Sequence, residues 1–151
     1  MVRVTNKSTK MKALNIATHP GLLIVSFLFI LISGEHLGGF YALYILLAVP
    51  HGWLHAILAV AGIFILLVSS NTNKSRRAIS NNILNIVGAI LLVLSIVVFF
   101  YADKEGYNYG TFYQTVPIIS LVLFGLVTLL FIIKNLVQSF SRKRIDTKIS
   151  Y

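Results

Sequence analysis

Two histidines, His51 and His55, are the residues of this sequence whose types and spacing best suit a joint chemical role. On an α-helix, residues four positions apart share one face, and two imidazoles at that spacing can bind one metal ion. His36 and Glu35 precede them and complete a set of three or four nitrogen and oxygen ligands. Because imidazole favours zinc or copper, the sequence predicts a zinc or copper site of His51, His55, His36 and Glu35.

Other interpretations of these histidines stay open. They also fit interface residues that hydrogen-bond to backbone carbonyls, Glu35 or water. A b-type haem would need His36 across the fold, because residues four apart cannot bind opposite faces of a haem. The chain has no cysteine, which excludes disulfides, thiolate metal sites and cysteine nucleophiles.

The composition indicates what kind of structure must position these side chains. Of the 151 residues, 57% are hydrophobic and 11% are charged, whereas soluble domains carry about 25% charged residues. The segments between the apolar runs are too short to fold as soluble domains. We therefore expect an all-α integral membrane protein with a single domain over residues 1–151 and the lipid bilayer as its surroundings.

Four apolar segments predict membrane-spanning helices, which need roughly 20 residues to cross a core of about 30 Å. The expected spans cover residues 14–33, 52–70, 83–101 and 116–134. The first is the least regular, because its apolar run starts at Gly21 and needs the upstream residues to reach full length. The prediction is a four-transmembrane-helix bundle.

A further apolar segment, residues 40–49, is too short to cross on its own. Joining it to the next run would bury Pro50 and Gly52 inside one long helix, which proline disfavours. We expect a short extra interfacial or re-entrant helix between the first two spans, with its aromatic residues near the lipid headgroups.

The distribution of charge sets the expected orientation. The formal net charge is +9, and twelve of the thirteen Lys and Arg residues lie at the N-terminus, in the loop 71–82 or from Lys134 onward. Lys and Arg accumulate on cytoplasmic flanks. The prediction is a plasma (inner) membrane protein with both termini cytoplasmic, Glu35 outside, and no nucleic-acid partner.

Small and polar residues mark the expected interior face of each helix, because close packing and hydrogen bonds drive helix association in lipid. At 100° per residue, one stripe appears on each span. The stripes are Ser26 and Ser33; His51, His55, Ala59 and Gly62; Asn81, Asn85, Gly88 and Ser95; and Ser120, Thr128, Asn135 and Gln138.

Function is the least determined property. None of the expected spans carries a carboxylate near its middle, which argues against an ion-coupled transporter. We expect a small non-enzymatic membrane protein, an accessory or assembly subunit of a membrane complex, with partner subunits or as a homo-oligomer. The alternatives are a zinc- or copper-binding membrane protein or enzyme that uses the outer histidines, and a small channel or transporter.

Overall fold

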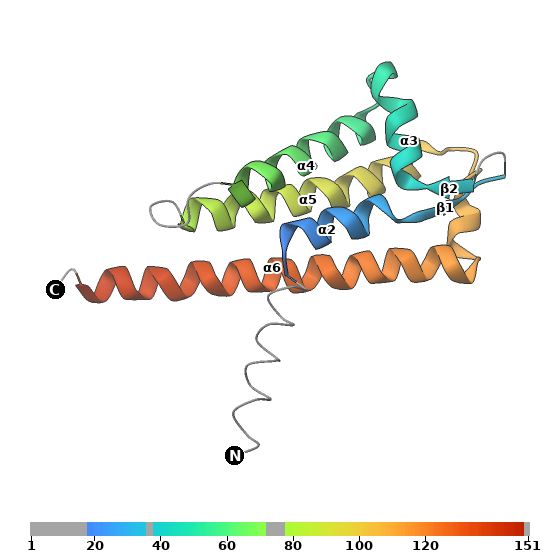
Figure 1. The fold of residues 1–151 in the computed structure, drawn as a ribbon. Coiled ribbons are helices and arrows are strands. Elements are labelled where there is room, and N and C mark those ends of the chain that lie inside the picture. Colours follow the sequence, from blue (N-terminus) through green and yellow to red (C-terminus); the bar gives the residue numbers. More distant parts are fainter. Residues whose placement is uncertain (1–17, 36–37, 72–77, 150–151) are drawn as a thin grey trace, which may run out of the picture.

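The computed structural model describes residues 18–35, 38–71 and 78–149, and this part of the chain is mostly helical (Figure 1). Three long helices lie side by side, with shorter elements packed against them. In chain order the elements are α2 (Pro20–Leu28), β1 (Leu31–Ser33), β2 (Gly38–Phe40), α3 (Tyr41–Ala48), the 3₁₀-helix η1 (Val49–His51), α4 (Leu54–Asn71), α5 (Ala78–Ala102), the 3₁₀-helix η2 (Tyr109–Phe112) and α6 (Thr115–Ile149).

The three long helices confirm the expected later spans. The segments Leu54–Asn71, Ser80–Ala102 and Thr115–Phe140 are each long and apolar enough to cross a membrane. They contain no proline in their interiors beyond the first turn of α6, where proline is tolerated. The fold therefore indicates a membrane protein in which large apolar side chains face outward from the long helices.

The first expected span differs from the continuous helix predicted for residues 14–33. The helix α2 starts at Pro20, where the Nδ1 of His19 accepts the N–H of Gly21 at 3.0 Å, and it ends at Leu28. The following residues are extended as β1, which pairs antiparallel with β2. Residues 14–17 of the prediction lie outside the described residues.

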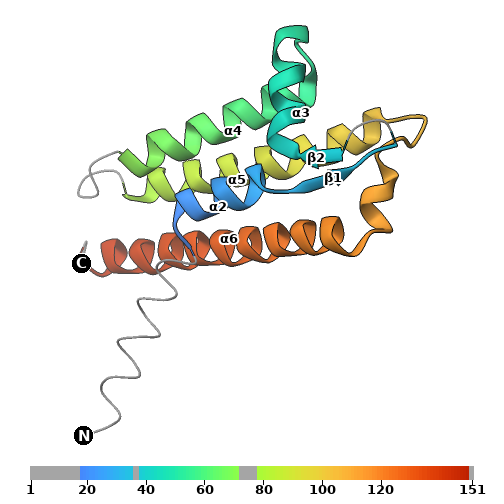
Figure 2. The ribbon, with the colours of Figure 1, turned by 45° about the vertical axis from the view of Figure 1, so that its right-hand side comes forward.

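The second edge of β1 explains how an extended segment is tolerated against the helices. The N–H of Leu31 donates to Ser120 Oγ at 2.9 Å, and the N–H of Ser33 donates to Thr111 Oγ1 at 2.9 Å. One step further, the N–H of Glu35 donates to the Tyr107 carbonyl at 2.9 Å. β2 lies along one edge of β1 (Figure 2). Because these groups bond to the other edge, the strand leaves few backbone donors unpaired.

The short helix expected over residues 40–49 is present as a separate element. α3 continues into η1, which carries Pro50 and ends at His51. Gly52 then adopts a left-handed conformation with φ of 66°, which suits glycine, and α4 begins at Leu54. The chain therefore reverses at Gly52, and α3 leans away from the long helices where α4 starts (Figure 1).

Most of the expected interior faces are buried. On α4, His55, Ala59 and Gly62 are buried, whereas Phe64 is exposed. Gly88 of α5 is buried where α5 meets α4. Two assignments are wrong, because His51 and Gln138 are exposed. The reversal at Gly52 separates His51 from α4. On α6, Asn135 is buried, and the buried face does not extend as far along the helix as Gln138.

Candidate ligand pocket

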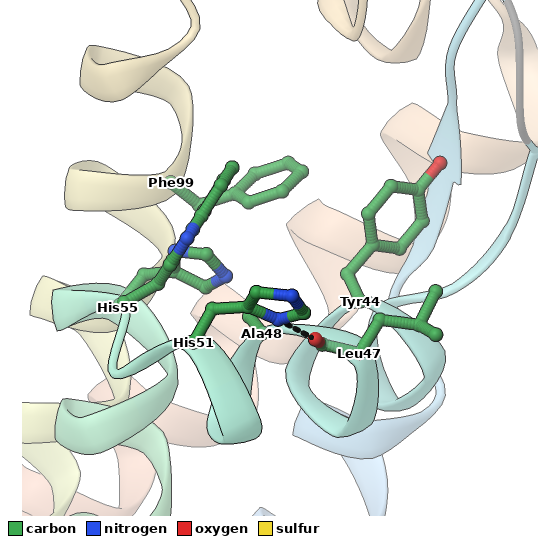
Figure 3. Close-up of a pocket in the computed structure, with 7 residues that line it drawn as sticks. Tyr44, Leu47, Ala48, His51, His55 and Phe99 are labelled. Carbon is green, nitrogen blue, oxygen red and sulfur yellow. Dashed lines mark hydrogen bonds between the residues drawn. The ribbon is translucent and has the colours of Figure 1, made fainter.

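The reversal at Gly52 places two elements around one pocket. η1 brings His51 to it from one side, and the first turn of α4 brings His55 from the other. The predicted arrangement, in which both imidazoles stack on one helix, is therefore wrong, because His51 and His55 belong to different helices. Both nevertheless line the same pocket, as Figure 3 shows.

The pocket has a volume of about 270 Å³. The described residues in its walls are mainly apolar and aromatic, with no acidic residue and no Lys or Arg among them. It is lined by Tyr44, Leu47, Ala48, His51, Trp53, His55 and Phe99, from α3, η1, the start of α4 and the end of α5. Such a lining, with few polar groups on apolar walls, is typical of sites for small molecules.

His55 is held firmly in the wall of the pocket. Its carbonyl oxygen accepts a hydrogen bond from Ser95 Oγ at 2.7 Å, and Ser95 Oγ in turn lies 2.9 Å from the Tyr41 hydroxyl. Its ring packs edge-on against Phe99, with 5.2 Å between ring centroids, and against Trp53 at 5.7 Å. These contacts fix the position of the imidazole.

The Nε2 atom of His55 has no hydrogen-bond partner among the described residues, although the side chain is only 3% exposed. Buried polar atoms are nearly always hydrogen-bonded. Leaving one unpaired costs about 1–3 kcal/mol. His55 therefore lines an apolar pocket and carries a buried nitrogen that has no partner in the described part of the chain.

The hydrogen bond of His51 shows which of its ring nitrogens carries the hydrogen in the neutral form. Its Nδ1 lies 2.9 Å from the carbonyl oxygen of Leu47 (Figure 3). A carbonyl oxygen can only accept, so Nδ1 carries the hydrogen of this bond. In the neutral ring, Nε2 is then left with a lone pair, which can accept a hydrogen bond or bind a metal ion.

Of the other two predicted metal ligands, the described structure places only Glu35, and it does so away from the pocket. Glu35 follows β1 and bonds through its backbone to the loop at Tyr107, and it does not line the pocket. His36 lies outside the described residues. In residues 18–35, 38–71 and 78–149 there is no group of three or more His, Cys, Asp or Glu side chains that could hold a metal ion.

The aromatic walls of the pocket were not predicted from the sequence. Tyr44 lies in the segment 40–49, whose aromatic residues we expected near the lipid headgroups, and Phe99 comes from α5. Tyr44 of α3 and Phe99 of α5 pack edge-to-face with 5.3 Å between ring centroids, so the α3 side and the α5 side of the pocket are in contact. In the sequence, Pro50 and Gly52 were the residues that indicated a break in the helix here.

No protein-family model, curated protein or solved structure matches this chain.

Proposed function

We propose that this chain is a small non-enzymatic membrane protein that binds a small organic molecule in the pocket between α3, α4 and α5. The observation that carries the proposal is His55, which lines an apolar pocket of about 270 Å³ and whose buried Nε2 has no hydrogen-bond partner among the described residues. Nε2 is itself buried, so a ligand atom reaches it only when a neighbouring side chain shifts. The bond would then remove the cost of the unpaired nitrogen, while the apolar walls would bury the rest of the ligand.

Four crossings are the topology that we propose for this protein, the first made by α2 and β1 together. Lys134 Nζ of α6 donates to Thr18 Oγ1 at 2.6 Å, just before α2. Leu31, at the start of β1, bonds to Ser120 of the same helix. The chain therefore runs beside α6 from Lys134 to Ser120, about 21 Å at 1.5 Å per residue. β1 extends this path beyond Ser120, and the combined length supports a full crossing of the membrane.

In this proposal both termini and the basic segment 72–77 lie on the cytoplasmic side of the plasma (inner) membrane. The basic flanks support this orientation. The turn at Gly52 and the η2 loop then lie on the outer side, because α5 separates η2 from the segment 72–77. The pocket opens near the outer surface of the membrane.

Retention of the ligand by the purified protein tests the binding function. Ala48 lines the pocket and is buried, so Ala48→Phe fills it with a larger ring. Mass spectrometry of an organic extract should find one small molecule in near-equal amount with the parent protein. The same molecule should be absent from Ala48→Phe and present in Leu54→Ala, which changes a neighbouring exposed side chain. Equal recovery from all three proteins contradicts the pocket as the binding site.

A zinc or copper ion at His51 and His55 is a second candidate. The bond from His51 Nδ1 to the Leu47 carbonyl is the contact that usually orients a metal-binding histidine, and it leaves Nε2 free for the ion. Metal content of the parent should be compared with that of the His51→Ala plus His55→Ala double variant. Near-stoichiometric zinc or copper, lost in the double variant, supports this candidate; a metal-free parent that ignores added zinc and copper contradicts it.

The accessory or assembly role belongs to the same proposal. A binding protein without its own chemistry acts through a partner or through a second copy of itself. Native mass measurement after gentle solubilisation should give a complex heavier than the 16.8 kDa chain with its lipid. A strictly monomeric mass contradicts this role and leaves the pocket proposal untouched.

A further inference from the structure

We infer that the ligand is a neutral, lipid-soluble ring compound with a carbonyl or hydroxyl oxygen on the ring, of the prenylated quinone or phenol class, which reaches the pocket sideways from the outer leaflet. This inference rests on the proposed function and names the ligand of that same pocket. Four properties of the pocket support it: its walls, its size, its surroundings and its polar atoms.

The walls favour a flat ring. Three of the seven described lining residues are aromatic: Tyr44, Trp53 and Phe99. Aromatic rings gain about 0.5–1.5 kcal/mol from stacked or edge-to-face contacts beyond the burial of their area. A flat ring can make such contacts with these walls, whereas a flexible acyl chain cannot.

The size favours one substituted ring. A cavity of about 150 Å³ holds benzene, and this pocket has about 270 Å³. The extra space fits the oxygens and small substituents of a quinone headgroup. A long isoprenoid tail does not fit and must remain outside the pocket.

The surroundings of the pocket provide a place for that tail. Leu47 and Trp53, which line the pocket, are 61% and 57% exposed. Leu46 and Leu54, next to them in the chain, are exposed as well. In a membrane protein such a surface meets the acyl chains, so a tail that leaves the pocket passes into lipid.

The polar atoms favour an uncharged oxygen. The seven described lining residues include no Lys or Arg that would bind a phosphate or a carboxylate. Nε2 of His55 can donate to a ring carbonyl or accept from a ring hydroxyl, according to its tautomer. Nε2 of neutral His51 can accept from a hydroxyl. A quinone or phenol oxygen matches these atoms, and an anionic lipid headgroup does not.

The chain carries its own reporter for the test. Trp53 is its single tryptophan and lies in the pocket wall, so a quinone in the pocket will quench all the tryptophan fluorescence of the protein. We would titrate the full chain in lipid nanodiscs with decyl-benzoquinone and, separately, with its hydroquinone. Decylbenzene, which has a flat six-carbon ring and the same tail but no oxygen, serves as the competitor that lacks the oxygen substituents.

We expect saturable quenching by decyl-benzoquinone and displacement of it by the hydroquinone. Decylbenzene should compete at least tenfold more weakly. His55→Phe, which keeps a ring and removes the nitrogen, should weaken quinone binding at least tenfold, whereas Leu54→Ala should not change it. The comparison of the two ligands on the unaltered protein needs no variant to fold.

The outcomes separate this inference from the proposed function. If decylbenzene competes as well as the hydroquinone, the oxygen on the ring has no role in binding, and the pocket remains an apolar binding site. Quenching that rises linearly with probe, as for tryptophan quenched at random in the bilayer, overturns the quinone or phenol class. If an organic extract of the same protein then contains another molecule, the binding function stands without this ligand class.

Discussion

At the residue scale, two glycines determine how closely α4 and α5 approach. A Cβ built on Gly88 would lie 2.8 Å from Leu66 Cγ and 3.1 Å from the Gly62 carbonyl oxygen. A Cβ on Gly62 would lie 3.0 Å from the Gly88 carbonyl oxygen. The two backbones therefore touch, as small residues allow in membrane helix pairs.

Replacing Gly88 by Leu should force α4 and α5 apart. We expect a loss of about 1–3 kcal/mol or more in the free energy of unfolding, because overpacking strains a close-packed contact. Leu54→Ala should change it by less than about 0.5 kcal/mol, since Leu54 is exposed. Unfolding in mixed detergent micelles measures both, and a larger loss from Leu54→Ala would show that the faces of α4 are wrongly assigned.

A row of polar side chains links the long helices at the other end of the molecule from the pocket. Ser69 Oγ of α4 donates to Asn85 Oδ1 of α5 at 2.6 Å, and Asn85 Nδ2 donates to Asn135 Oδ1 of α6 at 3.0 Å. Asn135 Nδ2 donates within its own helix to the Phe131 carbonyl at 2.8 Å. Asn85 thus joins three helices.

Truncation of this central residue, Asn85→Ala, should lower the free energy of unfolding by about 1–2 kcal/mol, because hydrogen bonds between membrane helices are worth about 0.6 kcal/mol on average and up to about 1.7. Ser70→Ala is the matched control, since Ser70 is exposed and, among the described residues, bonds to the Leu67 carbonyl of its own helix and to no other helix. If the two variants unfold alike, the row contributes nothing to stability.

At the element scale, β1 depends on hydroxyl groups far away in the sequence. Thr111 is fully buried and accepts the N–H of Ser33. Thr111→Val keeps the shape of the side chain and removes the acceptor, so the orphaned N–H should cost about 1–3 kcal/mol. Hydrogen exchange at Ser33 should accelerate at the same time, because its amide has lost its partner.

Thr115→Val is the control for this substitution, because Thr115 is exposed at the start of α6. It should change neither the free energy of unfolding nor the exchange at Ser33. Unchanged exchange at Ser33 in Thr111→Val would mean that the bond to Thr111 does not protect the strand.

The elements also show how far the sequence carries a prediction. The long helices were predictable because each apolar run is long enough to form the whole element by itself, with polar segments at both ends. β1 was not, because its hydrogen bonds to Ser120 and Thr111 join residues that are 89 and 78 positions apart. The pocket escaped prediction for a related reason: the turn at Gly52 separates the two histidines, and Phe99 arrives from another helix.

At the scale of the whole molecule, the four-crossing topology makes one prediction with a simple readout. The chain has no native cysteine, so single cysteines label without background. Thr5→Cys and Ser75→Cys should react with a membrane-impermeant maleimide only after permeabilisation. Lys104→Cys, in the exposed loop after α5, should react in intact cells.

Thr5 is the position that tests the unusual first crossing. If α2 and β1 do not cross together, Thr5 and Lys104 lie on the same side and label alike. Labelling of Ser75 in intact cells would instead reverse the orientation of the whole chain.

The bond between Leu31 and Ser120 also has a consequence for synthesis. During translation, the first segment emerges long before the hydroxyl that its backbone requires. The two residues are 89 positions apart, a delay of roughly 4–18 s at about 5–20 residues per second. Until α6 arrives, the nascent strand must keep that N–H in water or against the insertion machinery. β1 is therefore synthesised before α6 but completes its hydrogen bonds only after α6 has been made.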